Sequence, residues 1–280
     1  MTSYARRTVL AAAGATAVTG ALASGPARAA SQRDQRVIVF TKTSGYRHAC
    51  IPDAIAALSE LAADNGIYVV ATEDAAIFTP AELAKVTAVV FASTTGIILT
   101  AQARASIEAF VTSGGGWMGI HSAADTEYDW PFYTSLLSGG RFLCHPLVNQ
   151  SGTVVRESGS DISTAHLPAR WAIGTEEFYS FTTDVRGTAE VLLSLDESTY
   201  HPDPNTSLLP SGSPPYRMQI PTTGRMGDHP LAWRTPVGAG LSWYTALGHE
   251  PTLYADARFR QHLLGGLLTV SRHGQASLPS

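Results

Sequence analysis

The chain has 280 residues, of which 44% are hydrophobic and 15% are charged, and its formal net charge is −4. An acidic chain without basic clusters does not suit nucleic acid or an anionic membrane surface as a partner. The length is enough for one large α/β domain with a substantial core.

The N-terminus has the pattern of a cleaved export signal. Arg6-Arg7 precede an apolar run from Val9 to Ala23, and Ala27-Arg28-Ala29 forms an A-x-A cleavage site. Paired arginines resemble a twin-arginine signal, the address of proteins that are exported already folded. A membrane anchor is the alternative, but the run is short and weakly apolar. We expect residues 1–29 to be a signal peptide and the mature protein to be secreted or extracytoplasmic, with a charge of 16 − 23 = −7 and no membrane attachment.

Strands and helices alternate over the first half of the mature chain. Short apolar runs predict strands at 36–40, 67–71 and 88–92, and a fourth strand that ends at His121. Helical spacing and capping residues predict helices over about 52–63, from Pro80, after Thr100 and over about 131–137. This alternation predicts a parallel sheet with helices on both faces.

The second half is richer in strands and turns. Strands are expected at 153–155, 177–181, 190–195, 231–233 and 241–246, as a β-rich extension of the same domain. Residues 201–221 are rich in Pro, Ser and Gly and predict a surface loop. A helix over 259–271 should close a single domain of residues 30–272, and residues 273–280 are expected to form a flexible tail.

The segment from Gly114 to Asp125 predicts a functional site. It reads as a buried strand that ends in a sharp turn, where α/β folds display reactive side chains at the carboxyl edge of the sheet. The apex residue is His121, and imidazole binds a metal, moves a proton or holds a sugar hydroxyl, but replaces a cysteine nucleophile poorly. A second strand ends at Gly248-His249. If both strands lie in the middle of one sheet, both imidazoles face the same crevice.

Three further histidines have competing interpretations. His48 follows the first strand, where loops line the crevice, although it could instead cap a helix. His145, before Pro146, is equally consistent with a site and with a structural role. His229 opens a predicted strand and is similarly ambiguous.

Carboxylates near the motif are also open to two interpretations. Asp125 could orient an imidazole or bind a hydroxyl, and helix capping is the competing explanation. Alternation along a strand would point one of Glu176 and Glu177 inward, as a general base or a metal ligand, whereas two solvated charges are the simpler interpretation. A glycosidase with two carboxylates about 5–10 Å apart would need Glu177 and Asp125 to face each other.

Cys50 and Cys144 are the only cysteines. They could form one disulfide in an oxidising compartment, or remain two buried free thiols. The local signatures of zinc proteases, nucleotide-binding loops and serine hydrolases are absent from the sequence.

Several ordered motifs together resemble the ThuA-like (trehalose utilisation) family over about residues 36–268. The matching segments are Ser44–His48, Gly119–Asp125, Glu176–Tyr179, Leu195–Tyr200, Asp228–Trp233 and Tyr244–His249. The resemblance implies a flavodoxin-like sheet of the class I glutamine amidotransferase superfamily and a link to sugar catabolism. In that superfamily the elbow carries a nucleophilic cysteine, and His121 stands at that position here, so amidotransferase activity is not expected.

The working hypothesis is an exported carbohydrate-processing enzyme that hydrolyses or isomerises a disaccharide or keto-sugar by acid–base chemistry. The expected catalytic residues are His121, His249, Glu177 and Asp125, and the expected substrate-binding residues are Tyr46, Arg47, His48, Trp130, His145 and His229. His121, His249 and Glu177 are candidate ligands for a divalent metal such as zinc. The rival hypothesis is a non-catalytic sugar-binding module that stacks its small carbohydrate partner on Trp117, Tyr128, Trp130, Tyr133 and Trp243.

Overall fold

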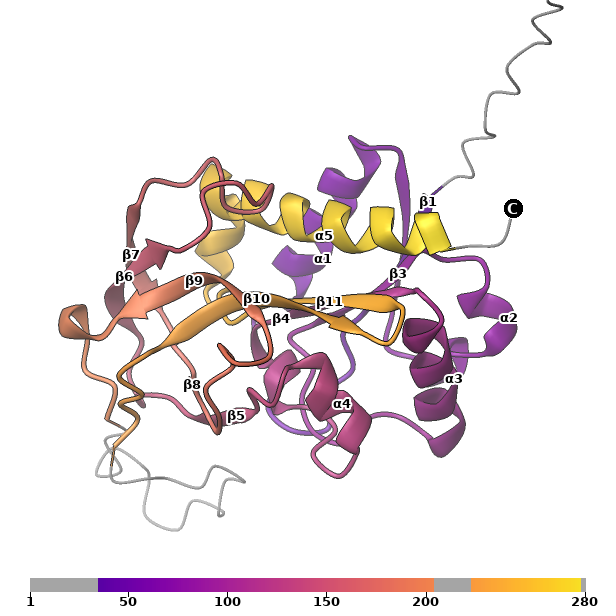
Figure 1. Ribbon diagram of the computed structural model, residues 1–280, viewed down its shortest axis with the longest axis horizontal. Helices are drawn as coiled ribbons and strands as arrows, with labels where there is room; N and C mark the ends of the chain where they lie inside the picture. Colours follow the sequence, from indigo (N-terminus) through magenta and orange to yellow (C-terminus); the bar gives the residue numbers. More distant parts are fainter. Residues whose placement is uncertain (1–34, 204–222, 278–280) are drawn as a thin grey trace, which may run out of the picture. The chain divides into compact units, whose positions relative to one another are not determined.

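Figure 1 shows the computed structural model of the protein, which describes residues 35–203 and 223–277. The predicted signal peptide at residues 1–29 and most of the predicted loop at 201–221 lie outside the described residues. Among the helices of the described segments, none has both the length and the apolar character needed to cross a membrane.

Within those segments, nine strands form one mixed sheet, and one half of it is parallel. Across this half the order is β2 (Ile67–Thr72), β1 (Gln35–Phe40), β3 (Ala88–Ala92), β4 (Gly116–Ile120) and β11 (Gly240–Thr245). Each neighbouring pair in this series runs parallel. The predicted α/β class with a parallel sheet is therefore confirmed. The strand order also changes direction at β1, so that the crevice at the carboxyl ends of β1, β3 and β4 is where such folds bind ligands.

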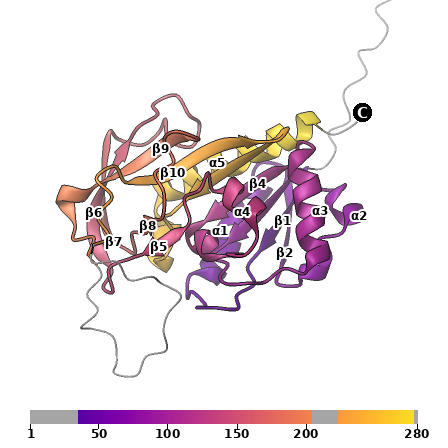
Figure 2. The same ribbon diagram turned by 60° about the horizontal axis from the view of Figure 1, so that its bottom comes forward.

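The other half of the sheet is the β-rich extension, and it is antiparallel. The order continues from β11 through β10 (Pro230–Val237), β9 (Glu190–Asp196), β6 (Gln150–Arg156) and β7 (Arg170–Glu176). Figure 2 shows these strands on the side away from β1 and β2. The short strands β5 (Phe142–Cys144) and β8 (Ser180–Phe181) form a separate antiparallel pair.

Helices cover both faces of the parallel half. Helices α1 (Ile51–Ala63) and α5 (Ala257–Ser277) lie on one face, and α3 (Ala101–Thr112) and α4 (Pro131–Leu136) lie on the other, with the short α2 (Pro80–Leu83) beside α3 (Figure 1). Short 3-10 turns span Ala75–Ile77, His121–Asp125, Glu197–Thr199 and Pro251–Ala255. The expected caps are present, since the Thr79 and Thr100 hydroxyls accept the N–H groups of Glu82 and Ala103, each at 3.2 Å.

Two details of the sequence-based expectations are wrong. The predicted strand at 177–181 is split, because β7 ends at Glu176 and the next strand, β8, begins at Ser180. The last helix does not stop at 271, and the helical backbone runs through Ser277 into the predicted flexible tail. The imidazole of His273 donates to the carbonyl of Ala239 at 2.7 Å, which attaches this last part of α5 to the β10–β11 turn.

The glycines before His121 are explained by close packing of β4. A Cβ atom on Gly116 would lie 2.4 Å from the carbonyl oxygen of Val270 in α5, and one on Gly119 would lie 2.3 Å from the ring of Trp117. β4 can therefore approach α5 closely only because position 116 carries no side chain, and Gly119 leaves room for the ring of Trp117.

Candidate functional site

The site begins where β4 ends. His121 is fully buried and has a φ of +51°, and Ser93, directly after the neighbouring strand β3, has a φ of +50°. The N–H of Ser93 donates to the carbonyl of Ile120 at 3.1 Å, which ties the two turns together. Non-glycine residues with positive φ are strained, and such strain concentrates at functional sites. The sharp turn predicted at His121 is therefore present, with an imidazole at its apex.

Four potential metal ligands converge at this turn. They are His48 after β1, His121 after β4, His249 after β11 and Glu177 after β7, and their donor atoms all lie within 4.8 Å of one another. Glu177 Oε2 lies 3.1 Å from His249 Nδ1, 3.4 Å from His121 Nε2 and 3.9 Å from His48 Nε2. His121 Nε2 in turn lies 3.2 Å from His48 Nε2 and 3.3 Å from His249 Nδ1. The fold thus unites His121, His249 and Glu177, as the sequence suggested, and adds His48.

Four of these five distances, 3.1–3.4 Å, fit a four-coordinate ion. Zinc–ligand bonds of about 2.0–2.1 Å imply donor atoms roughly 3.3–3.4 Å apart at the corners of a tetrahedron. The orientation of the rings fits as well. His121 Nδ1 lies 2.9 Å from the carbonyl oxygen of Ala246, which can only accept a hydrogen bond, so Nδ1 carries the proton and Nε2 presents a lone pair to the cluster. His48 Nδ1 contacts the hydroxyl of Ser122 at 3.2 Å. Metal-binding histidines are commonly held by such contacts of their second nitrogen.

The protonation states also suit metal binding. Burial lowers the pKa of His121 to about 3 and lowers that of His48 below its ordinary value, so both rings are neutral near pH 7. Burial opposes ionisation of Glu177, but its contacts with the imidazoles of His121, His249 and His48 outweigh burial and hold the pKa of Glu177 well below its usual range. Burial also acts to lower the pKa of His249, and contact with Glu177 more than compensates and raises it. Imidazoles with one carboxylate are a ligand set that zinc favours, and binding of an ion would release a proton held by His249.

Glu176 supports the cluster from behind, a role that the sequence analysis missed. Its carboxylate accepts the backbone N–H groups of Glu177 at 2.9 Å, His249 at 2.9 Å and Gly248 at 3.2 Å. Burial raises its pKa to about 7. The expectation that one carboxylate of the pair faces outward is wrong, because both Glu176 and Glu177 are buried. The chain leaves β7 at Glu176, so the alternation of a strand does not extend to Glu177.

A cavity of about 450 Å³ opens above the four-residue cluster. Its lining contains His48, Glu177 and His249, together with Ser44, Gly45, Tyr46, Gly96, Asp125, Phe142, His145, Leu147, Asn149 and Tyr179. The Tyr128 hydroxyl donates to the carboxylate of Asp125. His145 Nδ1 lies 3.2 Å from the second oxygen of Glu177 and 2.7 Å from the carbonyl of Pro146. The cavity therefore has carboxylates and imidazoles close to the cluster and aromatic side chains on its walls.

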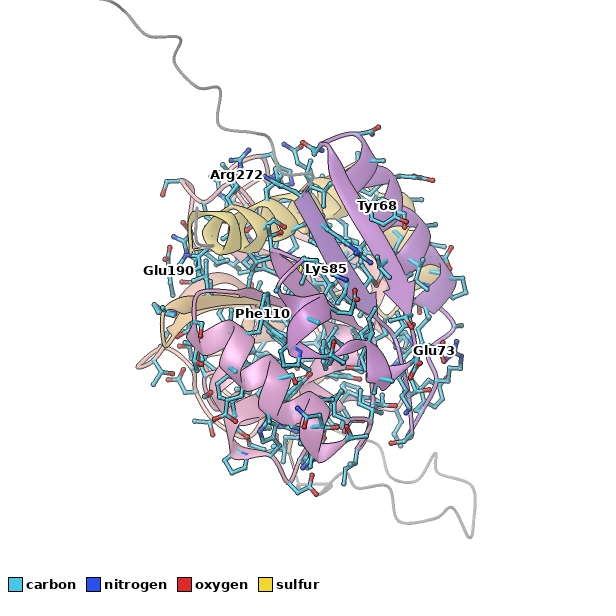
Figure 3. All side chains as sticks on the ribbon, turned by 90° about the vertical axis from the view of Figure 1, so that its right-hand side faces the viewer. Tyr68, Glu73, Lys85, Phe110, Glu190 and Arg272 are labelled. Atoms are coloured by element: carbon cyan, nitrogen blue, oxygen red, sulfur yellow. The ribbon has the colours of Figure 1, made fainter. Side chains whose placement is uncertain are left out.

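Three residues predicted to bind substrate lie outside this lining. Arg47 is exposed and forms an ion pair with Glu73 at 2.7 Å (Glu73 is labelled in Figure 3). Trp130 packs in the core under the guanidinium of Arg104, 5.9 Å from its ring. His229 is buried, 2.9 Å from a carboxylate oxygen of Glu197 and 2.8 Å from the carbonyl of Tyr179. His229 thus contacts the backbone of the segment that carries Glu177 rather than the cavity.

The aromatic residues of the sugar-stacking hypothesis are also placed differently. Trp117, Tyr133 and Trp243 are fully buried core residues, and Tyr128 is absent from the cavity lining. Tyr46, Phe142 and Tyr179 line the cavity instead. Tyr179 belongs to the Glu176–Tyr179 motif, so a signal for it was present in the sequence. Nothing in the sequence around Phe142 distinguished Phe142 from a core residue.

The two cysteines are both free and buried in this structure, which is the second of the alternatives considered from the sequence. Neither cysteine occupies the turn after β4, where His121 stands.

Comparison with known proteins identifies the family. A family model described as ThuA, trehalose utilisation, matches residues 36–268. A ThuA-like protein from Bacteroides uniformis is similar in structure, with 22% identity, a TM-score of 0.67 and coverage of 88% of this chain and 95% of that chain. A ThuA-like protein from Parabacteroides merdae has 14% identity, a TM-score of 0.63 and coverage of 85% and 90%.

A β-galactosidase from Bacillus circulans sp. alkalophilus is a further structural neighbour, with 15% identity and a TM-score of 0.50, and the match covers 87% of this chain but 31% of that one. No curated protein matches the sequence. At these identities the solved structures establish the fold alone, while the family model covers most of the chain. The chain therefore belongs to the ThuA, or trehalose utilisation, family.

Proposed function

We propose that this protein is an exported, metal-dependent enzyme that hydrolyses or isomerises a small carbohydrate, such as a disaccharide or keto-sugar, by acid–base chemistry. The observation that carries the proposal is the convergence of His48, His121, His249 and Glu177 at the floor of a cavity. Surface acidic clusters are common without a metal, but here three of the four side chains are buried and the fourth is half-buried. Burying such groups is costly unless they are paired or bind an ion.

The residues around the cluster suit a ligand with many hydroxyl groups. Carboxylate oxygens of Asp125 and Glu177 accept hydrogen bonds from hydroxyls, and the amide of Asn149 can both donate and accept. A bound divalent ion would act as a Lewis acid that polarises a carbonyl or hydroxyl oxygen of the ligand. His145, on the cavity wall outside the four-residue cluster, is placed to exchange a proton with a ligand hydroxyl.

Measurement of bound metal tests the proposal directly. The mature protein, purified without chelator and dialysed after addition of zinc, should retain about one ion per chain by elemental analysis. His249→Ala should lose the ion, as should His121→Asn, which keeps a donor for the Ala246 carbonyl. His201→Ala is a matched control, since His201 is an exposed histidine that bonds to the described residues through its backbone alone, and it should retain the metal. A wild-type protein without retained zinc would contradict metal dependence.

A second measurement separates an enzyme from a binding module. The zinc-loaded protein is incubated with disaccharides and their keto derivatives, and products are followed by mass spectrometry. Turnover that disappears in His249→Ala while ligand binding persists supports an enzyme. Binding without turnover in the wild type would instead support the non-catalytic module.

A further inference from the structure

Exposed apolar residues lie on the loops that form the mouth of the cavity. Five large hydrophobic residues of the described segments are exposed, and three of them line the cavity or directly adjoin a lining residue in the sequence: Tyr46 at 60%, Ile97 at 40% and Val148 at 56%. Tyr46 is itself part of the lining, Ile97 follows the lining residue Gly96, and Val148 lies between the lining residues Leu147 and Asn149. Single exposed hydrophobic residues need no explanation, but a group of them around a cavity indicates a binding surface.

The rim that carries Tyr46 and Ile97 is held in place. The hydroxyl of Thr95 donates to the carbonyl of Tyr46 at 2.8 Å, and the hydroxyl of Ser44 donates to the carbonyl of Ile97 at 2.9 Å. Gly96 has a φ of +75°, and a Cβ atom there would lie 2.3 Å from the hydroxyl of Ser44. The loops after β1 and β3 are therefore joined tightly, and both apolar side chains are presented by a fixed backbone.

Tyr46 lies between the exposed apolar residues at the mouth of the cavity and the polar residues near the four-residue cluster. Its ring meets the ring of His48 edge-on, with centroids 4.8 Å apart, while most of its surface faces solvent. On the other wall, Phe142 packs against Tyr179 with centroids 4.3 Å apart, and Leu147 completes the lining. The side chain of Asn149 donates to Glu250 at 2.5 Å, which anchors the segment that carries Val148 beside the loop of His249.

We propose that the mouth of the cavity is a subsite for an apolar group attached to the carbohydrate. The ligand class is thus a glycoside with an aromatic or alkyl aglycone, whose sugar ring lies near His48, Asp125 and Glu177 and whose aglycone lies on Tyr46, Ile97 and Val148. The polar residues of the cavity suit the sugar ring, and the exposed apolar residues at its mouth suit the aglycone. This proposal rests on the proposed carbohydrate function and adds the second half of the ligand.

Matched pairs of glycosides test the subsite. Binding of phenyl and methyl β-D-glucopyranoside, and of the corresponding α pair, is measured by calorimetry on the zinc-loaded mature protein. In at least one pair the phenyl compound should bind about tenfold more tightly, the effect expected for half-burial of one aromatic ring. The double variant Ile97→Ser/Val148→Ser should reduce this advantage to less than about threefold, while the methyl compound keeps its affinity.

The chain offers a matched control in its other two exposed hydrophobic residues. Tyr68 lies on the edge strand β2, as labelled in Figure 3, and Ile162 lies beside α5, and neither lines the cavity. The double variant Tyr68→Ser/Ile162→Ser should therefore retain the full preference for the phenyl compound.

The outcomes separate this proposal from the proposed function. Equal affinities within each pair would overturn the apolar subsite and leave the carbohydrate function standing. Failure of all four compounds to bind would count against the carbohydrate function and would overturn the subsite with it. Light scattering gives a further check, since a wild-type dimer that dissociates in Ile97→Ser/Val148→Ser would assign the rim to a second copy of the chain and overturn the subsite.

Discussion

The carboxylate of Glu176 accepts the backbone N–H of His249 at 2.9 Å, and so joins two segments that are 73 residues apart in the sequence. The same carboxylate accepts the N–H groups of Glu177 and Gly248. One buried acid thus fixes the backbone of two of the four proposed metal ligands. Its role is to position Glu177 and His249 rather than to contact a ligand in the cavity.

We therefore expect Glu176→Gln to weaken zinc binding. Glutamine has nearly the same shape but only one acceptor oxygen, and its NH₂ group would face a backbone donor. Loss of such a supporting contact costs about 10- to 100-fold in metal affinity. Competition with a chromogenic chelator measures the effect. Glu60→Gln is the control, because Glu60 is an exposed residue of α1 whose carboxylate pairs with Arg260 at 2.9 Å, and it should keep zinc affinity within about twofold. Wild-type affinity in Glu176→Gln would contradict the positioning role.

The order of elements up to His121 and the turn at His121 follow from the sequence alone, because each depends on local patterns. Short apolar runs alternate with capped helical segments, and a glycine-rich strand leads into His121-Ser122. These features set backbone conformation over a few residues at a time, and tertiary packing does not override them. The convergence of His121 and His249 was predictable too, since both follow strands of one parallel sheet.

The remainder of the site depends on contacts between distant segments. Glu177 directly follows β7, which lies at the far edge of the antiparallel half. The segment after Glu177 is held by the pairing of β8 with β5 and by the contact of His229 with the carbonyl of Tyr179. No local sequence pattern predicts these contacts between distant segments. Trp130 and His229 were predicted to bind substrate because they lie in or near site motifs in the sequence. Their side chains are buried outside the cavity lining, which again depends on contacts between distant segments.

Packing of β4 against α5 makes a second prediction. Gly116→Ala should destabilise the protein by about 1–3 kcal/mol or more, because the new methyl group would meet the backbone oxygen of Val270, which has little freedom to move. Gly174→Ala is the matched control, since a Cβ atom at Gly174 in β7 has no neighbour within 4 Å. Urea denaturation of both variants measures the difference. Equal stabilities would show that α5 can move away from β4 without cost.

The proposed export signal makes a third prediction. Mass spectrometry of the protein secreted by a host with a twin-arginine pathway should give an N-terminus at Ala30. Replacement of Arg6-Arg7 by two lysines should block export and leave the uncleaved chain inside the cell, because the pathway recognises the arginine pair. An Ala30 N-terminus in the doubly substituted protein would point to another export route, and an uncleaved chain in the membrane fraction would favour the anchor.

Buried His262 in α5 makes stability depend on pH in a defined direction. Its Nδ1 donates to the carbonyl of Ser163 at 2.8 Å, its Nε2 contacts the hydroxyl of Thr245 at 3.2 Å, and burial lowers its pKa to about 4. The nearby charges of His166 and Asp161 act on it in opposite directions. The unfolded chain, with an ordinary pKa of about 6.5, binds the proton more tightly than the folded protein does. The contribution of His262 is therefore complete above pH 6.5 and is lost as the pH falls from 6.5 towards 4.

The expected loss attributable to His262 between pH 7.5 and pH 5 is about 2 kcal/mol. His262→Asn keeps a donor for Ser163 but does not titrate in this range, so it isolates the effect from that of other groups. The variant should be less stable than the wild type at pH 7.5, and the gap between the two should narrow by about 2 kcal/mol at pH 5. Urea denaturation at the two pH values measures the gap. A gap that stays constant would mean that His262 is not held neutral by burial, and that acid sensitivity of the fold arises at other groups.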